Sequence, residues 1–539
     1  MKTTIASHLV RRLRELDVQE GFGIVGDFIL KLFGRIDELG FPIHVTADEQ
    51  GAAFAADAYA RLRGFGVVAV TYGVGGLKIA NATAGAWAEQ VPLLVLSGAP
   101  GMKERENDPM LHHKVKTFET QLDVFRDLTI AQAVLSEPAT AAREIDRVIQ
   151  ACIASQRPGY IEVPRDMVNV EIDGVDGPLP PFMPMIDKAR LDEAVRQVVG
   201  RIEASTNCVL AAGAMAVRRR LHDPFRELCE LLDCPVATTS LAKGFFPERH
   251  PLSRGVYMGA VSPEETVRVV EGADPLVACG ALYTDLTMGG FTAKLDRTRI
   301  IHATDTRLHI GLATYDDVPL QAFLPALLQA LRVRRTVPDR RHEFRTFACE
   351  LTDSPLTVEI VVDCLEAALD ERHGLIFEPG DSLFASVELS APSWGLASGY
   401  YATMGNGLPA ALGAGKADPT RRPVVLTGDG AFLMTGLELA AAHYHGIEPI
   451  VVILDNDGYG TQRPMLDGPF NDIPSLRAER LTEVIGAGTG YLCMTQAELH
   501  RALEAAVASA QFSIIRARVP KRQPSAALAR LTAALARNV

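Results

Sequence analysis

Short apolar runs rich in β-branched residues alternate along the chain with longer segments of helical periodicity. A short continuous apolar run is typical of a strand buried on both faces, and helices between such strands favour a parallel sheet. Near the N-terminus, apolar residues at helical spacing predict an amphipathic helix over Met1–Leu16 instead of a signal peptide. The predicted strands are 22–25, 43–46, 67–71, 93–97, 160–163, 209–212, 236–239, 276–279, 300–303, 375–378, 424–427, 450–454 and 514–517.

Two breaks divide this pattern. Asp173–Pro184 is rich in Gly and Pro, which is a linker composition, and Arg332–His342 is basic and poor in strands. We therefore predict an α/β protein with three successive domains, each a parallel sheet flanked by helices. The domains are 1–175, 185–335 and 345–539, and the last ends in a tail, Pro520–Val539, that finishes as a helix.

Composition and charge exclude several functions. The 539 residues include 54 basic and 66 acidic side chains, a net charge of −12, without a long Lys/Arg run, so we expect neither nucleic acid nor a membrane surface as partner. No apolar stretch reaches the roughly 20 residues needed to cross a bilayer. The eight cysteines lack CxxC spacing, which favours buried thiols in a reducing compartment, and we expect a cytoplasmic protein.

Polar clusters directly follow two of the predicted strands in the third domain. Gly428-Asp429-Gly430 follows the strand ending at Thr427, and Asp455-Asn456-Asp457-Gly458 follows the strand ending at Leu454. Open α/β sheets bind ligands at the carboxyl ends of their strands. A carboxylate, an amide oxygen and a carbonyl near Gly458 suit a hard divalent cation, and the glycines allow a diphosphate to approach the backbone. Gly-Asp-Gly alone is more often a strand-capping turn, but the second cluster favours the ligand site.

These motifs resemble those of a known family. Gly-Asp-Gly followed at this interval by Asn-Asp-Gly is similar to the metal and diphosphate motif of thiamine diphosphate enzymes. The first domain, with Phe22–Asp27, Asp48-Glu49-Gln50 and Leu111-His112-His113, resembles the pyrimidine-binding domain of the pyruvate, indolepyruvate and phenylpyruvate decarboxylases. The resemblance implies thiamine diphosphate and Mg2+ as cofactors. It also implies a homodimer, or a tetramer made of two dimers, with active sites at the interface between chains.

The resemblance assigns roles to individual residues. Glu49 matches the acid that hydrogen-bonds the aminopyrimidine ring, and Met404 matches the apolar wedge beneath the folded cofactor. Asp27, His112 and His113 match the proton-handling group, which Asp285 and the residue at Gln462 complete. The resemblance places the metal on Asp429, Asn456 and Gly458. The other cofactor positions are Asp381, Ser382, Gly428, Gly430 and Ala431, and the substrate pocket positions are Leu286, Leu383 and Thr461.

The chain departs from the family pattern at two positions. Asp455 stands where the family usually has the first of two asparagines, but the second, Asn456, is the ligand. Gln462 stands where many of these decarboxylases carry a glutamate, and an amide cannot donate an acidic proton. Either another acid, for which Asp285 is our candidate, replaces the glutamate, or the chemistry differs.

These observations lead to one hypothesis and two alternatives. We expect non-oxidative decarboxylation of a bulky, aromatic 2-oxo acid such as phenylpyruvate or indolepyruvate, giving the aldehyde and CO2. The alternatives are a carboligase that forms acyloins on the same scaffold and a weakly catalytic cofactor-binding protein. A dinucleotide site at Gly405–Ala410, which fits G-x-G-x-x-A, is disfavoured because no acidic residue ends a following strand at the required distance.

Overall fold

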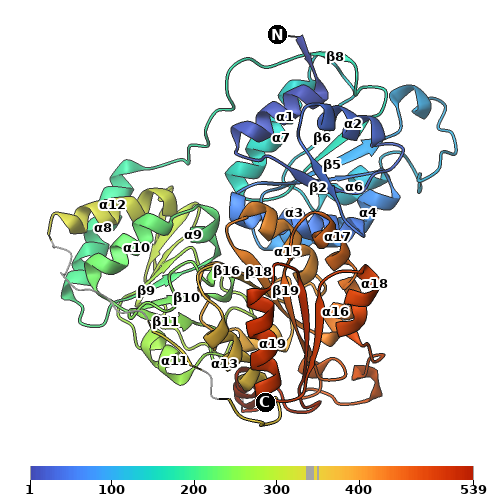
Figure 1. The fold of residues 1–539 in the computed structure, drawn as a ribbon. Coiled ribbons are helices and arrows are strands. Elements are labelled where there is room, and N and C mark those ends of the chain that lie inside the picture. The colour runs from blue at the N-terminus through green and yellow to red at the C-terminus, as the bar shows by residue number, and fades with distance from the viewer. Residues whose placement is uncertain (1, 335–344, 349–350, 538–539) are drawn as a thin grey trace. The chain divides into compact units, whose positions relative to one another are not determined.

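The computed structural model describes residues 2–334, 345–348 and 351–537 (Figure 1). Most of the predicted second break, from 335 onward, lies outside the described residues. Contacts between described residues group the chain into two compact units. The first comprises Met1–Met183, Leu408–Pro419 and Leu437–Ile447, and the second comprises Pro184–Gly407, Thr420–Gly436 and Glu448–Val539.

The first unit contains a six-stranded parallel sheet in the order β3-β2-β4-β5-β7-β6. Its strands are β2 (Gly21–Gly23), β3 (Ile43–Val45), β4 (Gly66–Val70), β5 (Leu93–Ala99), β6 (Gln132–Val134) and β7 (Gly159–Pro164). Its helices are α1 (Ile5–Glu15), α2 (Leu30–Glu38), α3 (Glu49–Arg63), α4 (Val74–Lys78), α5 (Ala80–Ala88), α6 (Thr120–Arg126) and α7 (Ala141–Ser155). A separate antiparallel pair joins β1 (Lys2–Thr4) to β8 (Glu171–Asp173).

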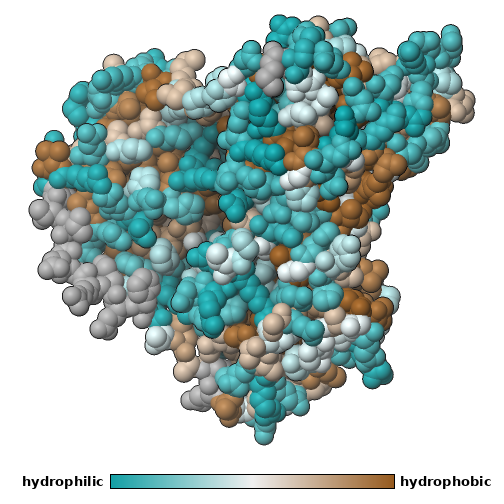
Figure 2. Space-filling model, turned by 45° about the horizontal axis from the view of Figure 1, so that its top comes forward, coloured by the Kyte–Doolittle hydropathy of each residue, from teal (hydrophilic) through white to brown (hydrophobic). Residues whose placement is uncertain are grey.

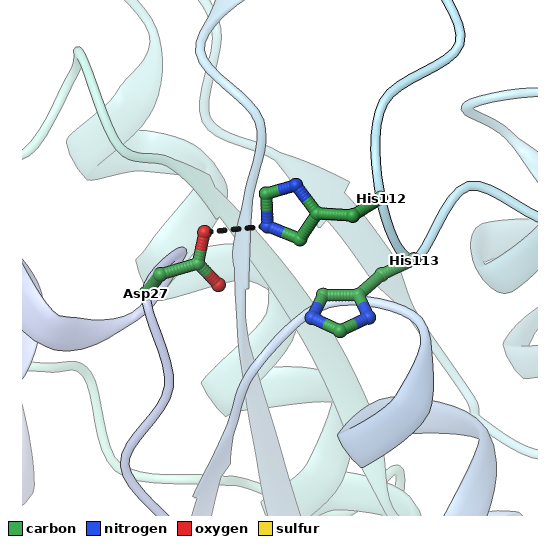
Figure 3. A group of neighbouring side chains, drawn as sticks. All are labelled: Asp27, His112 and His113. Atoms are coloured by element: carbon green, nitrogen blue, oxygen red, sulfur yellow. Dashed lines mark hydrogen bonds and ion pairs between the residues drawn. The ribbon is translucent and has the colours of Figure 1, made fainter.

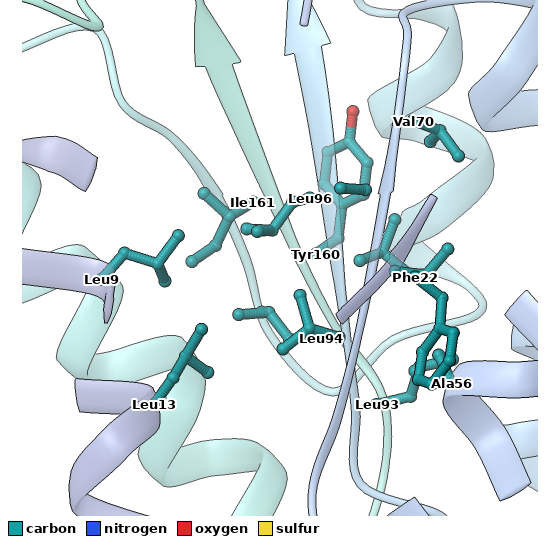
Figure 4. Close-up of a cluster of buried hydrophobic side chains, with 14 of the residues drawn as sticks. Leu9, Leu13, Phe22, Ala56, Val70, Leu93, Leu94, Leu96, Tyr160 and Ile161 are labelled. Atoms are coloured by element: carbon teal, nitrogen blue, oxygen red, sulfur yellow. The ribbon is translucent and has the colours of Figure 1, made fainter. Parts of the chain in front are cut away.

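Both faces of this sheet are covered, which explains why its strands read as continuous apolar runs. Every residue of β4 and β5 is buried. In Figure 4, Leu9 and Leu13 of α1 lie on one side of the strands, and Phe22 packs near Ala56 of α3 on the other. The Asp48 side chain caps the N-terminus of α3, and Gly64, at φ 91°, ends the helix in a conformation that favours glycine.

The second unit contains a seven-stranded sheet in the order β11-β10-β9-β12-β13-β14-β15. Its strands are β9 (Val209–Ala212), β10 (Val236–Thr238), β11 (Ser253–Val256), β12 (Leu276–Cys279), β13 (Ile300–Ala303), β14 (Arg307–Ile310) and β15 (Ala313–Asp316). Its helices are α8 (Lys188–Ala204), α9 (Ala214–Arg218), α10 (His222–Leu232), α11 (Glu264–Glu271) and α12 (Leu320–Arg332).

The prediction of a parallel sheet was wrong at one edge of this second sheet. β13, β14 and β15 pair antiparallel. The connections between them are a few residues long, too short for the crossover that a parallel pair needs.

The second unit also contains a six-stranded parallel sheet in the order β17-β16-β18-β19-β21-β20. Its strands are β16 (His373–Phe377), β17 (Gly395–Ala397), β18 (Arg422–Gly428), β19 (Ile450–Asp455), β20 (Thr489–Cys493) and β21 (Ser513–Arg518). The helices of this region are α13 (Val358–Ala368), α14 (Asp381–Ala385), α15 (Gly407–Ala417), α16 (Asp429–Thr435), α17 (Glu438–Tyr444), α18 (Leu481–Ile485), α19 (Gln496–Ala508) and α20 (Ala526–Ala536). Most of α15 and all of α17 belong to the first compact unit.

The predicted strands are all present, with ends that differ by two residues at most. The prediction of a helix from Met1 was wrong at its start, because Lys2–Thr4 pair with β8 and α1 begins after the Thr4 N-cap. Of the seven cysteines among the described residues, none forms a disulfide, and six are buried.

The surface mixes apolar and polar side chains. On the face drawn in Figure 2, brown apolar side chains are scattered among teal hydrophilic ones. A search of the described helices finds none with the length and hydropathy of a membrane span.

Candidate functional site

Three side chains that the sequence analysis grouped lie together in the first unit. Asp27 follows β2, and His112 and His113 lie on the loop before α6. His112 Nε2 is 2.7 Å from Asp27 Oδ2, and one ligand atom from each residue lies within 4.8 Å of the others (Figure 3). The fold therefore joins residues 85 positions apart into one acid and imidazole cluster.

Neighbouring groups orient this cluster. The Phe28 ring stacks on His112 with ring centroids 4.8 Å apart, and Arg165 lies 3.7 Å from the Asp27 carboxylate. His113 has a φ of 65°, and its carbonyl lies so close to Gly73 that a Cβ there would be 2.3 Å from the carbonyl oxygen. The side chains of Asp27 and His112 are 42% and 56% exposed, so they can exchange protons with a ligand or with solvent.

Glu49 is the first residue of α3, and the sequence analysis missed its partner. Lys78 Nζ of α4 lies 3.1 Å from Glu49 Oε2 and 2.5 Å from Asp48 Oδ2. The hydrogen bond to Asp48 raises the pKa of Lys78, burial opposes that rise, and Glu49 adds to it. A charged ammonium therefore stands beside the predicted activating acid. The pairing depends on how α4 packs against α3, which residue spacing does not reveal.

Glu438, at the start of α17, is a second residue that sequence analysis missed. Its Oε2 accepts a hydrogen bond of 3.2 Å from the Ala47 amide, just before α3 begins. A Cβ atom on residue 51 would lie 1.9 Å from Glu438 Oε1, so only a glycine at this position leaves room for the carboxyl group. Glu438 is 2% exposed, and burial raises its pKa to about 7. In the sequence, Glu438 lies in a segment of ordinary helical periodicity, and no motif there marks it as a site residue.

The two polar clusters of the second unit meet at one edge of the sheet. β18 and β19 are neighbours, with Gly428 opposite Leu454. Asp429 accepts hydrogen bonds from the Gly430 amide (2.8 Å, Oδ1) and the Gly458 amide (3.0 Å, Oδ2). Burial raises the pKa of Asp429 to about 6, the two amides oppose that rise, and Asp455 and Asp457 add to it. A bound cation would stabilise the ionised form of the Asp429 carboxyl group.

Asn456 tests whether the site suits Mg2+. Among the described residues, no hydrogen-bond partner contacts its buried Oδ1. A buried amide oxygen without a partner costs free energy that a hard cation would recover. Together with the Asp429 carboxylate and the backbone at Gly458, this orphaned oxygen fits the donor set of a magnesium ion.

Arginines account for the unusual aspartate at 455. Arg516 Nε is 2.6 Å from Asp455 Oδ2, and Arg518 Nη1 is 3.1 Å from Asp455 Oδ1. Arg518 also binds Asp457 and lowers its pKa. These pairs neutralise both aspartates without using Asn456, so the departure from the family pattern leaves the amide oxygen available.

The remaining predicted cofactor residues lie on two segments. Asp381, at the start of α14, binds the Ser525 amide and hydroxyl, so its carboxylate holds the N-terminus of α20. The Ser382 hydroxyl donates to the Glu378 carbonyl at 2.6 Å. Met404 is partly buried beside Gly405, and Ala431 is buried in the first turn of α16.

The predicted pocket residues differ in exposure. Leu383 is buried in α14, whereas Leu286 and Thr461 are partly exposed. Asp285, on the loop after β12, and Gln462, in the short 3-10 helix Gly460–Gln462, are exposed. Both polar side chains are therefore open to a ligand.

Comparison with known proteins matches three family domains along the chain. The model of the thiamine pyrophosphate enzyme N-terminal TPP binding domain matches residues 3–125, the central domain model matches 195–331, and the C-terminal TPP binding domain model matches 383–517.

Several relatives are similar to the chain over 90% or more of its length. The chain is 36% identical to an indole-3-pyruvate decarboxylase of Azospirillum brasilense over 98% of this chain and 97% of the relative. It is 32% identical to an alpha-keto-acid decarboxylase of Mycobacterium tuberculosis over 94% of this chain and 92% of the relative. It is 29% identical to pyruvate decarboxylase isozyme 3 of Saccharomyces cerevisiae over 90% of this chain and 89% of the relative.

Proposed function

Because the chain belongs to the thiamine diphosphate-dependent 2-oxo acid decarboxylase family, we propose that its substrate is a bulky, aromatic 2-oxo acid such as phenylpyruvate or indolepyruvate. The products are CO2 and the corresponding aldehyde. The similarity of almost the whole chain to a relative named for indole-3-pyruvate carries this choice of substrate.

The cofactors of the family are thiamine diphosphate and, as the usual metal, Mg2+. When bound, thiamine diphosphate supplies an electron sink for the carbanion left by CO2. In our proposal, Asp429, Asn456 and the Gly458 carbonyl hold the metal. Gly428 and Gly430 bring the backbone close to the diphosphate, and the segments at Ala431 and at Asp381 and Ser382 complete its cradle.

We assign proton transfer to the first unit. The Asp27 carboxylate orients His112 through their hydrogen bond, so the imidazole can hold a proton for the carbon that becomes the aldehyde. His113 adds a second imidazole 4.7 Å from the first, measured between ring centroids. Glu49 presents its carboxyl group to the aminopyrimidine of the cofactor, and Lys78 steadies that side chain.

The substrate side chain would lie near Leu286, Leu383 and Thr461. The resemblance places aromatic rings at the first two positions in dedicated pyruvate decarboxylases, so leucines leave space that an aryl group can fill. Asp285 then serves as the acid that Gln462 cannot be. Its exposure is consistent with reaching a bound ligand.

We further propose a homodimer, or a tetramer made of two dimers, that shares active sites between chains. Large apolar side chains near the cofactor motif support this assembly, because Leu433 and Met434 of α16 are 43% and 52% exposed. We also propose a cytoplasmic location, which the cysteines of the described residues suit because they form no disulfide.

A panel of 2-oxo acids tests the proposal. Purified protein with thiamine diphosphate and Mg2+ is incubated with pyruvate, phenylpyruvate and indolepyruvate, and CO2, aldehyde and acyloin are measured. Aromatic substrates should give stoichiometric CO2 and aldehyde. Acyloin with little free aldehyde would identify a carboligase, which the exposed Gln462 favours as the second candidate, and no CO2 from any substrate would indicate a cofactor-binding protein with little catalysis.

A further inference from the structure

Glu378 is a buried carboxylate that contacts three consecutive backbone amides. It follows β16, and its side chain reaches the N-terminus of α15. Oε1 accepts hydrogen bonds from Gly405 (2.6 Å) and Asn406 (3.2 Å), and Oε2 accepts one from Gly407 (2.7 Å). The residue is 1% exposed. Neither the sequence motifs nor the roles proposed above use it.

Both side-chain oxygens of Glu378 must be hydrogen-bond acceptors, because each of them faces at least one amide donor. Burial raises the pKa of Glu378 to about 7, while the three amides oppose that rise by stabilising the ionised form. A Cβ at residue 407 would lie 2.5 Å from Oε2, so Gly407 leaves space that the carboxylate fills. A glutamine of the same size would turn an NH2 group toward at least one amide donor.

The three amides belong to the loop that carries Met404. Gly405 directly follows Met404 and has a φ of 85°, and Ala402, with φ 58°, adopts a conformation that residues with a Cβ seldom adopt. A loop in such conformations needs contacts that hold it. The backbone of Glu378 also accepts the Ser382 hydroxyl, so one residue ties the Asp381–Ser382 segment to the Met404 loop.

We propose that Glu378 is a positioning residue that fixes the Met404 loop in the shape that receives thiamine diphosphate. The inference rests on the proposed function, since it assumes that Met404 lies beneath the cofactor. Glu378 acts through the backbone of residues 405–407 and does not touch the reacting atoms. Its loss should therefore weaken cofactor binding, because the energy of ordering the loop must then be supplied when the cofactor binds.

The decisive variant is Glu378→Gln, which keeps the side-chain volume. Calorimetric titration of the apo-protein with thiamine diphosphate at saturating Mg2+ should show a Kd raised at least tenfold. With saturating cofactor, the KM for the 2-oxo acid should stay within a few-fold of wild type. The matched control is Glu366→Gln, since Glu366 is another buried carboxylate of the second unit that accepts a backbone hydrogen bond, from Ser390 at 2.6 Å. The Kd of Glu366→Gln for thiamine diphosphate should stay within twofold of the wild-type value.

A double variant separates loop positioning from a general loss of stability. If Glu378 acts through Met404, adding Glu378→Gln to Met404→Ala should raise the Kd little beyond the single Met404→Ala variant. The proposal would be overturned if the two substitutions weakened thiamine diphosphate binding by free energies that add fully in the double variant. It would also be overturned if Glu378→Gln bound the cofactor with the wild-type Kd.

Amide hydrogen exchange gives a test that needs no variant. In wild-type apo-protein, the amides of residues 405–407 should exchange slowly, and exchange at the rate of an unstructured peptide would refute the contact even if Glu378→Gln fails to fold. Failure of the wild type to bind thiamine diphosphate would instead refute the proposed function, so the two failures are distinguishable.

Discussion

In the first compact unit, Asp27 and His112 contact each other through exposed side chains. In the second unit, Glu378 is buried and Asp429 is partly buried, and both accept hydrogen bonds from backbone amides. Glu378 directly follows β16 and Asp429 directly follows β18, so the sheet places both carboxylates once the fold forms. The exposed pair depends on two loops and on side-chain torsions, which leaves it free to change its hydrogen-bond partners.

This difference suits the two tasks that we propose for these groups, which are cofactor binding and proton transfer. A cofactor site benefits from groups that are already in position, because less conformational entropy is lost on binding. Proton transfer needs groups that a bound ligand can reach, which exposure permits. We therefore expect substitutions in the buried half to affect binding and stability together, and substitutions in the exposed half to affect turnover alone.

The largest effect is expected for Asp429→Ala. The change removes the only carboxylate of the proposed metal site, so Mg2+-dependent binding of thiamine diphosphate and CO2 release should both fall below detection. Asp457→Asn is the control, because Asp457 pairs with Arg518 and lies outside the proposed donor set. Calorimetry and a CO2 assay on both variants check this, and retained cofactor affinity in Asp429→Ala would contradict the metal assignment.

Asp27→Asn should leave binding intact and reduce turnover. Losing the carboxylate that orients His112 should lower kcat by roughly 100-fold, as expected when general acid–base catalysis is lost. Because Asp27 is exposed, the unfolding midpoint should change little. Steady-state kinetics and thermal melting measure both effects, with Asp37→Asn, near the C-terminus of α2, as the control. A large drop in the stability of Asp27→Asn would mean that the exposed cluster also supports the fold.

The pocket gives a smaller expected effect. Wild-type kcat/KM for phenylpyruvate should exceed that for pyruvate by more than about tenfold, because an aryl group recovers burial that a methyl group cannot. Leu286→Phe should narrow this ratio, since Leu286 is partly exposed and can be enlarged without overpacking a buried position. Ratios of kcat/KM for the two substrates measure it, and a wild-type preference for pyruvate would refute the pocket assignment.

The smallest effect concerns the pH dependence of stability through Glu438. Its folded pKa of about 7 lies above its ordinary value of 4.5, so its protonated form stabilises the fold at low pH. That contribution is lost as the pH rises from about 4.5 through about 7, by up to about 1.4 kcal/mol per pH unit.

Glu438→Gln should remove this slope and keep the acceptor for the Ala47 amide. Urea unfolding at several pH values between 5 and 8, with exposed Glu371→Gln as control, measures the difference. An unchanged slope in Glu438→Gln would show that Glu438 is not the titrating group.

The sequence by itself determined most of the buried parallel strands and the position of the candidate metal motif, but it did not reveal strands such as β6, β11 and β14. Parallel strands buried on both faces must be apolar along their whole length, so β5 and β19 are visible as continuous runs, and the polar residues that end β18 and β19 mark their carboxyl ends. These features depend on neighbouring residues, which a sequence displays directly. The family resemblance added Asp27, His112 and His113, which spacing alone would not have grouped.

Only the tertiary structure decided which charged side chains support the candidate site. Glu438 contacts Ala47 across 391 positions, Glu378 reaches Gly405 across 27, and Lys78 meets Glu49 because two helices pack together. The pairing of Asp455 with Arg516 and Arg518 likewise follows from the register of β19 and β21. Each of these partners is chosen by which strands and helices become neighbours, and the free energy of that choice is spread over the whole core, so no local pattern records it.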